Sequence, residues 1–126
     1  GVRLLLVEDN KINQMVAKGL LSKEGASITV ADNGSLALEA LRAQPQAFDL
    51  VLMDLQMPEM DGFEATRVIR HELGLRTLPI VAMTANAMAS DRQACLDAGM
   101  DDHVGKPFQI DQLVATIRRF VPEATD

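Results

Sequence analysis

Apolar residues gather in five short runs along the chain, and polar turn residues follow each run. The runs lie near residues 3–7, 27–31, 49–53, 78–83 and 102–105. Their length and composition are typical of buried strands. After each run, apolar residues recur with helical spacing, near 11–24, 35–43, 62–73, 87–97 and 109–120. This alternation predicts an α/β domain whose parallel sheet is covered by helices on both faces.

Capping and turn residues mark the ends of these segments. Asn10 is placed to cap the first helix and Gly25 to end it. No repeat, linker or low-complexity segment interrupts the 126 residues, so we predict a single domain over residues 1–126. Because the chain lacks an initiator methionine and begins almost directly in a strand, we expect it to be a domain of a longer polypeptide.

The amino-acid composition argues against some classes of binding partner. A net charge of −6 and the lack of Trp and Tyr argue against a nucleic-acid partner, which requires clustered Lys and Arg. A single cysteine rules out an internal disulfide and indicates a reducing, cytoplasmic location. No apolar stretch reaches transmembrane length, so we expect no membrane contact by this domain, even where the longer chain is membrane-anchored.

Carboxylates follow two of the predicted strands. Glu8 and Asp9 come after the first strand, and Asp54 ends the third. Parallel α/β sheets hold their ligands at the carboxyl ends of the strands, so we expect these side chains to meet. Oxygen ligands without His or Cys favour Mg²⁺, Mn²⁺ or Ca²⁺. Taken alone, Glu8 and Asp9 are equally consistent with a solvated acidic turn.

Two further polar residues end the remaining strands. Thr84 follows the fourth strand, where its hydroxyl could donate to an oxyanion. Lys106 precedes Pro107 after the fifth, where its ammonium could balance the carboxylates or bind a phosphoryl oxygen. In isolation, Thr84 is more often a plain strand residue than a functional one, and Lys106 is also consistent with an exposed lysine before a turn proline.

Together these segments resemble the receiver domain of two-component response regulators. The residues that carry the resemblance are 7–10, 53–62, 83–85 and 105–108. From Asp54 to Gly62 the chain reads Asp-x-x-Met-Pro-x-Met-Asp-Gly, and the other three segments stand in the family's order and spacing. The details are most similar to receivers attached to hybrid histidine kinases. The resemblance implies a flavodoxin-like, doubly wound five-stranded parallel sheet of order 2-1-3-4-5 with five helices.

The resemblance also implies a phosphorelay function and a metal. Asp54 would accept a phosphoryl group from a phosphohistidine domain, either a histidine kinase or a histidine phosphotransfer domain. Glu8, Asp9, Asp54 and the backbone carbonyl of Gln56 would surround one Mg²⁺, for which Mn²⁺ could substitute, with Glu8 acting through water. The domain would thereby catalyse its own phosphorylation, and hydrolysis of the acyl phosphate would limit the signal.

The remaining implied roles concern the phosphoryl oxygens and the conformational switch. Lys106 would contact the phosphoryl group, and Thr84 would be the switch hydroxyl. His103 occupies the family's aromatic switch position, where Tyr or Phe is commoner, so this chain departs from the pattern there.

Three other classes of protein fit this sequence less well. An aspartyl phosphohydrolase would have a second carboxylate two residues after its nucleophile, whereas this chain has Gln56. A flavin binder would have a Gly/Ser/Thr-rich loop after the first strand, which residues 9–12 do not supply. A receiver-like interaction module that is never phosphorylated is disfavoured by the complete set of site residues.

The first helix carries more apolar surface than a sheet can cover. Its apolar arc spans roughly 240°, against a little over 100° for a helix docked on a sheet. If Val16, Ala17 and Leu20 face the sheet, Ile12 and Met15 lie on an exposed edge with Gly19 between them. We therefore predict that Ile12, Met15 and Gly19 form a docking patch for a four-helix phosphotransfer domain, scattered surface hydrophobes being the alternative.

Overall fold

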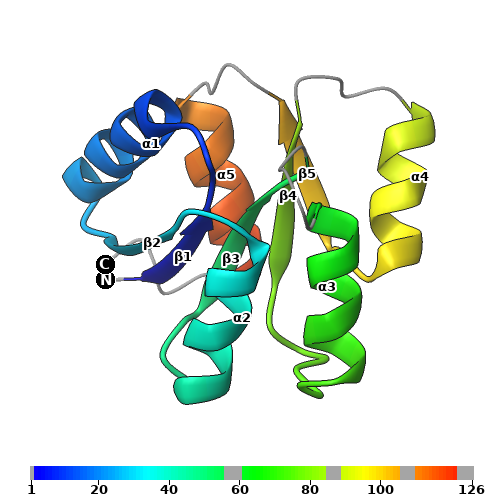
Figure 1. Cartoon of the computed structure of the whole chain (residues 1–126). Helices are drawn as coiled ribbons and strands as arrows, with labels where there is room; N and C mark the ends of the chain where they lie inside the picture. The colour runs from blue at the N-terminus through cyan, green and yellow to red at the C-terminus, as the bar shows by residue number, and fades with distance from the viewer. Residues whose placement is uncertain (1, 56–60, 85–88, 106–109, 122–126) are drawn as a thin grey trace.

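The structure is a computed structural model that describes residues 2–55, 61–84, 89–105 and 110–121 (Figure 1). Strands and helices alternate along it as the hydrophobic pattern predicts. In chain order the elements are β1 (Arg3–Val7), α1 (Lys11–Lys23), β2 (Ser27–Ala31), α2 (Gly34–Ala43), β3 (Leu50–Asp54), α3 (Gly62–His71), β4 (Ile80–Thr84), α4 (Ala89–Ala98), β5 (Asp102–Gly105) and α5 (Ile110–Phe120). In the described part of the chain, no helix is long and apolar enough to cross a membrane.

The strands form one parallel sheet of order β2-β1-β3-β4-β5, which confirms the predicted topology. The register aligns the carboxyl ends of the central strands. Val7 of β1 lies opposite Met53 of β3, so the residues that follow them, Glu8 and Asp54, are level with each other. Thr84 ends β4 opposite Gly105 of β5. The described side chains that are predicted to form the site therefore lie at one edge of the sheet.

Two hydrophobic cores form because side chains alternate between the faces of each strand. Leu5 and Val7 belong to the core under α2, α3 and α4, whereas Leu4 and Leu6 belong to the core under α1 and α5. Figure 1 shows the same division of the helices, with α2 and α3 in front of the sheet and α5 behind it. The strands β3 and β4 are buried along their whole length, as expected for the middle of a parallel sheet.

Local signals set the ends of the elements. The Asn10 side chain accepts hydrogen bonds from the backbone N–H groups of Ile12 (2.9 Å) and Asn13 (3.1 Å), which confirms it as the α1 cap. Gly25 has a φ of 89°, a conformation that glycine adopts without strain, and it stands just beyond the helix. β4 begins at Ile80 rather than near 78, because Pro79 has no N–H to donate and only its carbonyl joins the ladder, accepting from Val51 at 2.9 Å.

Candidate functional site

Three carboxylates meet at the carboxyl edge of the sheet. Glu8, Asp9 and Asp54 each offer an oxygen, and these oxygens lie within 4.8 Å of one another. Glu8 and Asp54 are buried, with 1% and 2% exposure, whereas Asp9 is exposed. Three negative charges at this separation repel strongly where water is excluded, so the arrangement favours a bound cation. An all-oxygen donor set suits a hard divalent ion.

Backbone hydrogen bonds hold two of these carboxylates in place. The Glu8 N–H donates to the carbonyl of Ala31 at 3.1 Å, which extends the β1–β2 ladder one residue past β1. The Leu55 N–H donates to the carbonyl of Met83 at 3.1 Å, which does the same for β3 and β4 just after Asp54. The acidic residues therefore project from rigid strand ends rather than from long loops.

Thr84 lies where the pattern placed it. It is the last residue of β4, is 4% exposed, and stands one position beyond the residue that pairs with Asp54 in the sheet register. Gln56 and Lys106 lie outside the described residues, so their roles stay predictions.

His103 lies in β5, beside an ion pair that the sequence did not reveal. Its Nδ1 is 3.7 Å from the Oδ1 of Asp102, which also accepts the His103 N–H at 2.8 Å. Arg119 of α5 binds the other oxygen of Asp102 at 2.8 Å. An imidazole that is four-fifths buried beside a β5–α5 ion pair is compatible with a switch position, but a switching role stays a prediction.

The prediction for α1 was right for its exposed edge and wrong for part of its buried face. Ile12 and Met15 are 72% and 74% exposed, and Gly19 is exposed as well. Ala17 is buried as predicted, but Val16 is 46% exposed and joins the outer edge. The helix buries positions 14, 17 and 21, a spacing of three and four residues, so Gln14 takes the place expected of Val16.

Gln14 contacts the site, although the hydrophobic pattern of the sequence gives it no such role. Its side-chain amide donates to the backbone carbonyl of Glu8 and to the Oδ1 of Asp32, the latter at 2.7 Å. The same oxygen accepts from the ammonium of Lys11 at 2.9 Å. These hydrogen bonds, that of Gln14 first and that of Lys11 second, lower the pKa of Asp32. The one available signal was Asp32 itself, a carboxylate directly after β2.

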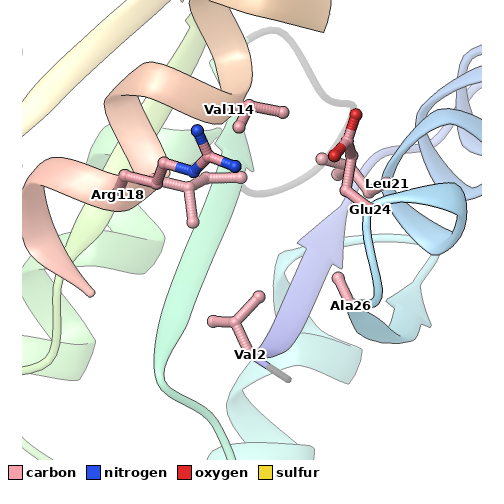
Figure 2. A pocket seen from close by; sticks show the side chains of 7 residues that line it. Val2, Leu21, Glu24, Ala26, Val114 and Arg118 are labelled. Atoms are coloured by element: carbon pink, nitrogen blue, oxygen red, sulfur yellow. The ribbon is translucent and has the colours of Figure 1, made fainter. Parts of the chain in front are cut away.

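A small cleft between α1 and α5 lies at the opposite end of β1 from the carboxylates. Figure 2 shows Val2, Leu21 and Val114 lining it, with the charged groups of Glu24 and Arg118 facing each other across its mouth. Val2 precedes β1, whereas Glu8 follows it, so the cleft is separated from the acidic cluster by the length of the strand. Its lining is mainly aliphatic and includes none of the predicted site residues.

Most of the chain matches the sequence model of one protein family. The model described as "Response regulator receiver domain" matches residues 4–118. Histidine kinase 3 of Arabidopsis thaliana is 40% identical over 100% of this chain, and sensor histidine kinase GacS of Pseudomonas protegens is 44% identical over 94% of it. The chain spans only 14% and 13% of the length of these two relatives.

Solved structures show the same fold. The receiver domain of sensor histidine kinase PA1611 from Pseudomonas aeruginosa, which has a magnesium ion coordinated in its active-site cleft, is 41% identical, with a TM-score of 0.86 over 97% of this chain and 98% of that one. A chain from the co-crystal structure of the Saccharomyces cerevisiae histidine phosphotransfer protein Ypd1 with the receiver domain of Ssk1 is 30% identical, with a TM-score of 0.86 over 94% of this chain and 88% of that one.

Proposed function

The chain belongs to the response regulator receiver domain family, and from this premise we propose that Asp54 accepts a phosphoryl group from a phosphohistidine. One observation carries the proposal. The Asp54 carboxylate is 2% exposed at the end of a buried strand, yet two more carboxylate oxygens lie within 4.8 Å of it. Such a cluster disfavours folding unless a cation balances it, so a purely structural role would not explain its presence.

Mg²⁺ is the cation that the donor set fits. Glu8, Asp9 and Asp54 would hold it, together with the backbone carbonyl of Gln56, and Glu8 would act through a bound water. When bound, the ion lowers the negative charge that an incoming phosphoryl group meets. Mn²⁺ accepts the same oxygen ligands and is expected to substitute. The magnesium ion in the Pseudomonas aeruginosa relative supports this choice.

The transfer itself is a nucleophilic substitution at phosphorus. A carboxylate oxygen of Asp54 bonds to the phosphorus while the P–N bond of the phosphohistidine breaks, and its electron pair returns to the imidazole, which takes up a proton. Lys106 and Thr84 would balance charge on the phosphoryl oxygens, by an ammonium and by a hydroxyl donor respectively. Water attacking the resulting acyl phosphate restores Asp54 and releases inorganic phosphate.

Phosphorylation would switch the domain through Thr84. The acyl phosphate carries about two negative charges near the end of β4, where the Asp54 carboxylate carried a single one. The Thr84 hydroxyl would turn toward them, and the space it leaves would admit the His103 side chain from β5. That exchange biases the surface formed by α4, β5 and α5 between two states.

The exposed edge of α1 is the proposed docking surface for the phosphohistidine partner. Ile12, Met15 and Gly19 lie on it, with the exposed Val16 beside them. Lys11 begins this helix three residues after Glu8, so the patch adjoins the sheet edge that carries Asp54. The yeast receiver that is crystallised with a histidine phosphotransfer protein supports a partner of this kind.

The relatives also support a context for the domain. Because the chain spans about a seventh of their length, we place it as one receiver domain, over residues 1–126, of a longer hybrid histidine kinase. In such a kinase we expect this domain and its phosphohistidine partner to lie in the cytoplasm, whether or not the longer chain is anchored in a membrane.

The direct test is Asp54→Asn, with transfer of labelled phosphoryl from phosphoramidate in Mg²⁺ as the measurement. The variant should incorporate none, while the exposed Asp97→Asn makes the same chemical change in the last turn of α4, far from the carboxyl edge of the sheet, and should match wild type. Label retained at full stoichiometry in Asp54→Asn would place the acceptor elsewhere. A wild-type domain that takes up no label from either phosphoramidate or a phosphohistidine partner would instead favour an unphosphorylated interaction module.

A further inference from the structure

Gln14 stands at a position where helical periodicity calls for an apolar side chain. It shares the buried face of α1 with Ala17 and Leu21, and it is 8% exposed. A buried amide is unfavourable unless its donors are satisfied, and here both known acceptors belong to other elements. They are the backbone carbonyl of Glu8, after β1, and the side chain of Asp32, after β2.

Gln14 donates hydrogen bonds to both residues that flank Asp9 in the chain. Its backbone N–H donates to the carbonyl of Asn10 at 3.0 Å, and its side chain donates to the carbonyl of Glu8. The residues on either side of Asp9 are therefore both tied to Gln14. Because the Glu8 N–H is also bound, by Ala31 at 3.1 Å, the Glu8 residue is held at both of its backbone polar groups.

Asp32 anchors the amide in this orientation. Its Oδ1 accepts from Gln14 at 2.7 Å and from the Lys11 ammonium at 2.9 Å, so an ionised acceptor faces the amide donor. Lys11, Gln14 and Asp32 thus join the start of α1, the acidic turn and the end of β2.

We propose that Gln14 is a positioning residue that holds the turn carrying Glu8 and Asp9 in its cation-binding shape, with Asp32 as its anchor. The inference rests on the proposed function. Without a cation, repulsion among the three carboxylates pushes this turn away from Asp54, and the hydrogen bonds of Gln14 oppose that movement. A preformed turn binds the cation more tightly because binding no longer has to order it.

Gln14→Leu tests the proposal, since leucine suits a buried helix position but donates no hydrogen bond. Mg²⁺ affinity, measured by titration calorimetry, should fall about tenfold, the lower end of what loss of a ligand-orienting contact produces. Thr116→Val is the matched control, because it removes a buried hydroxyl that donates to the Gln112 carbonyl at 2.9 Å on α5. It should lower stability yet leave Mg²⁺ affinity within about twofold of wild type, because α5 carries none of the proposed ligands.

Substitutions of Asp32 give a second test, and because Asp32 is exposed they do not disturb the core. Asp32→Asn removes the charge but keeps an oxygen that can accept from Gln14, whereas Asp32→Ala removes both. If Asp32 works by anchoring the amide, Asp32→Ala should weaken Mg²⁺ binding several-fold more than Asp32→Asn does. If Asp32→Asn and Asp32→Ala weakened Mg²⁺ binding equally, Asp32 would act only through its charge, and its anchoring role would be overturned.

Amide hydrogen exchange without metal separates this inference from the proposed function. Gln14→Leu should speed exchange of the Glu8 N–H well beyond any change at Leu6, which lies inside the β1 ladder. Unchanged Glu8 exchange, together with unchanged Mg²⁺ affinity, would overturn the positioning role. A wild-type domain that bound no Mg²⁺ would overturn the proposed function instead, and the exchange measurement would still decide whether Gln14 holds the turn.

Discussion

Gly62 lies directly against the backbone of Asp54: a Cβ atom at position 62 would come within 2.5 Å of the Asp54 carbonyl oxygen. The same atom would lie 3.0 Å from the Cγ of Met53. Only glycine lets α3 begin this close to the end of β3. The helix start, capped by Asp61 through the Glu64 N–H at 2.9 Å, therefore fixes the strand end that carries the proposed phosphoryl acceptor.

Gly62→Ala should destabilise the domain by about 1–3 kcal/mol, because the added methyl group forces backbone apart in a packed region. Mg²⁺ affinity should fall with it, since the end of β3 must shift. Urea unfolding followed by circular dichroism measures the first effect, and titration calorimetry the second. Gly19→Ala is the control: among the described residues, no atom outside the neighbouring helix backbone lies within 4 Å of its added Cβ, so stability should rise by up to about 1 kcal/mol from helix propensity. Equal stabilities for the two variants would contradict the steric argument.

Mg²⁺ should raise the melting temperature of the domain, because the ion binds the folded carboxylate cluster and not the unfolded chain. At a hundredfold excess over its dissociation constant, the gain is about 2.7 kcal/mol. The chain has no Trp or Tyr, so circular dichroism is the suitable probe. Asp9→Asn, which keeps the shape of an exposed ligand but removes its charge, should reduce the shift. A wild-type melting curve that stays constant up to tens of millimolar Mg²⁺ would rule out the site.

Ile12→Lys combined with Met15→Glu should slow phosphoryl transfer from a histidine phosphotransfer protein at least tenfold, corresponding to about 1.4 kcal/mol of lost contact energy. Phosphorylation by acetyl phosphate should barely change, because a small donor needs no docking surface. Leu96→Lys is a control on α4, where the leucine is 45% exposed away from this patch. If transfer from both donors fell equally, the variant would have damaged the helix, and the patch would not be a docking surface.

Acid should weaken the link between the start of β1 and the loop before β3. Arg3 donates two side-chain hydrogen bonds to Asp49, and this hydrogen bonding is the main cause that lowers the pKa of Asp49 below its ordinary value of 3.8. The folded state therefore binds the proton less well than the unfolded state. The pair stabilises the fold fully above pH 3.8, and this contribution is lost as the pH falls below that value toward the lowered pKa.

Urea unfolding of wild type and Asp49→Asn at a series of pH values tests this. The stability difference between them should be largest near neutral pH and should shrink in acid. A wild-type advantage that is constant from pH 7 to pH 3 would show that the carboxylate charge of Asp49 is not what stabilises the fold.

Much of the site could be predicted from sequence because it depends on positions along single strands. A buried apolar run such as 50–53 can only be a central strand here, so the residue that ends it, Asp54, must lie at the sheet edge. Glu8 follows the same logic after β1, and the register places the two level with each other. The order of the strands did not follow from periodicity, since every parallel strand of this kind looks alike. It came with the family resemblance, and the structure confirmed it.

Tertiary structure alone decided which face of α1 is buried and what its polar residue does. Periodicity compares the polarity of side chains, and by that measure Val16 belonged inside, while nothing in the pattern indicated a buried role for the polar Gln14. The acceptors that make Gln14 favourable in the interior lie 6 and 18 residues away, on the ends of two different strands. The closeness of Gly62 to Asp54 has the same origin, because it exists only once α3 packs against the end of β3. A hydrophobic pattern records how much each side chain avoids water, whereas hydrogen-bond partners and steric clearances are set by residues that only folding brings together.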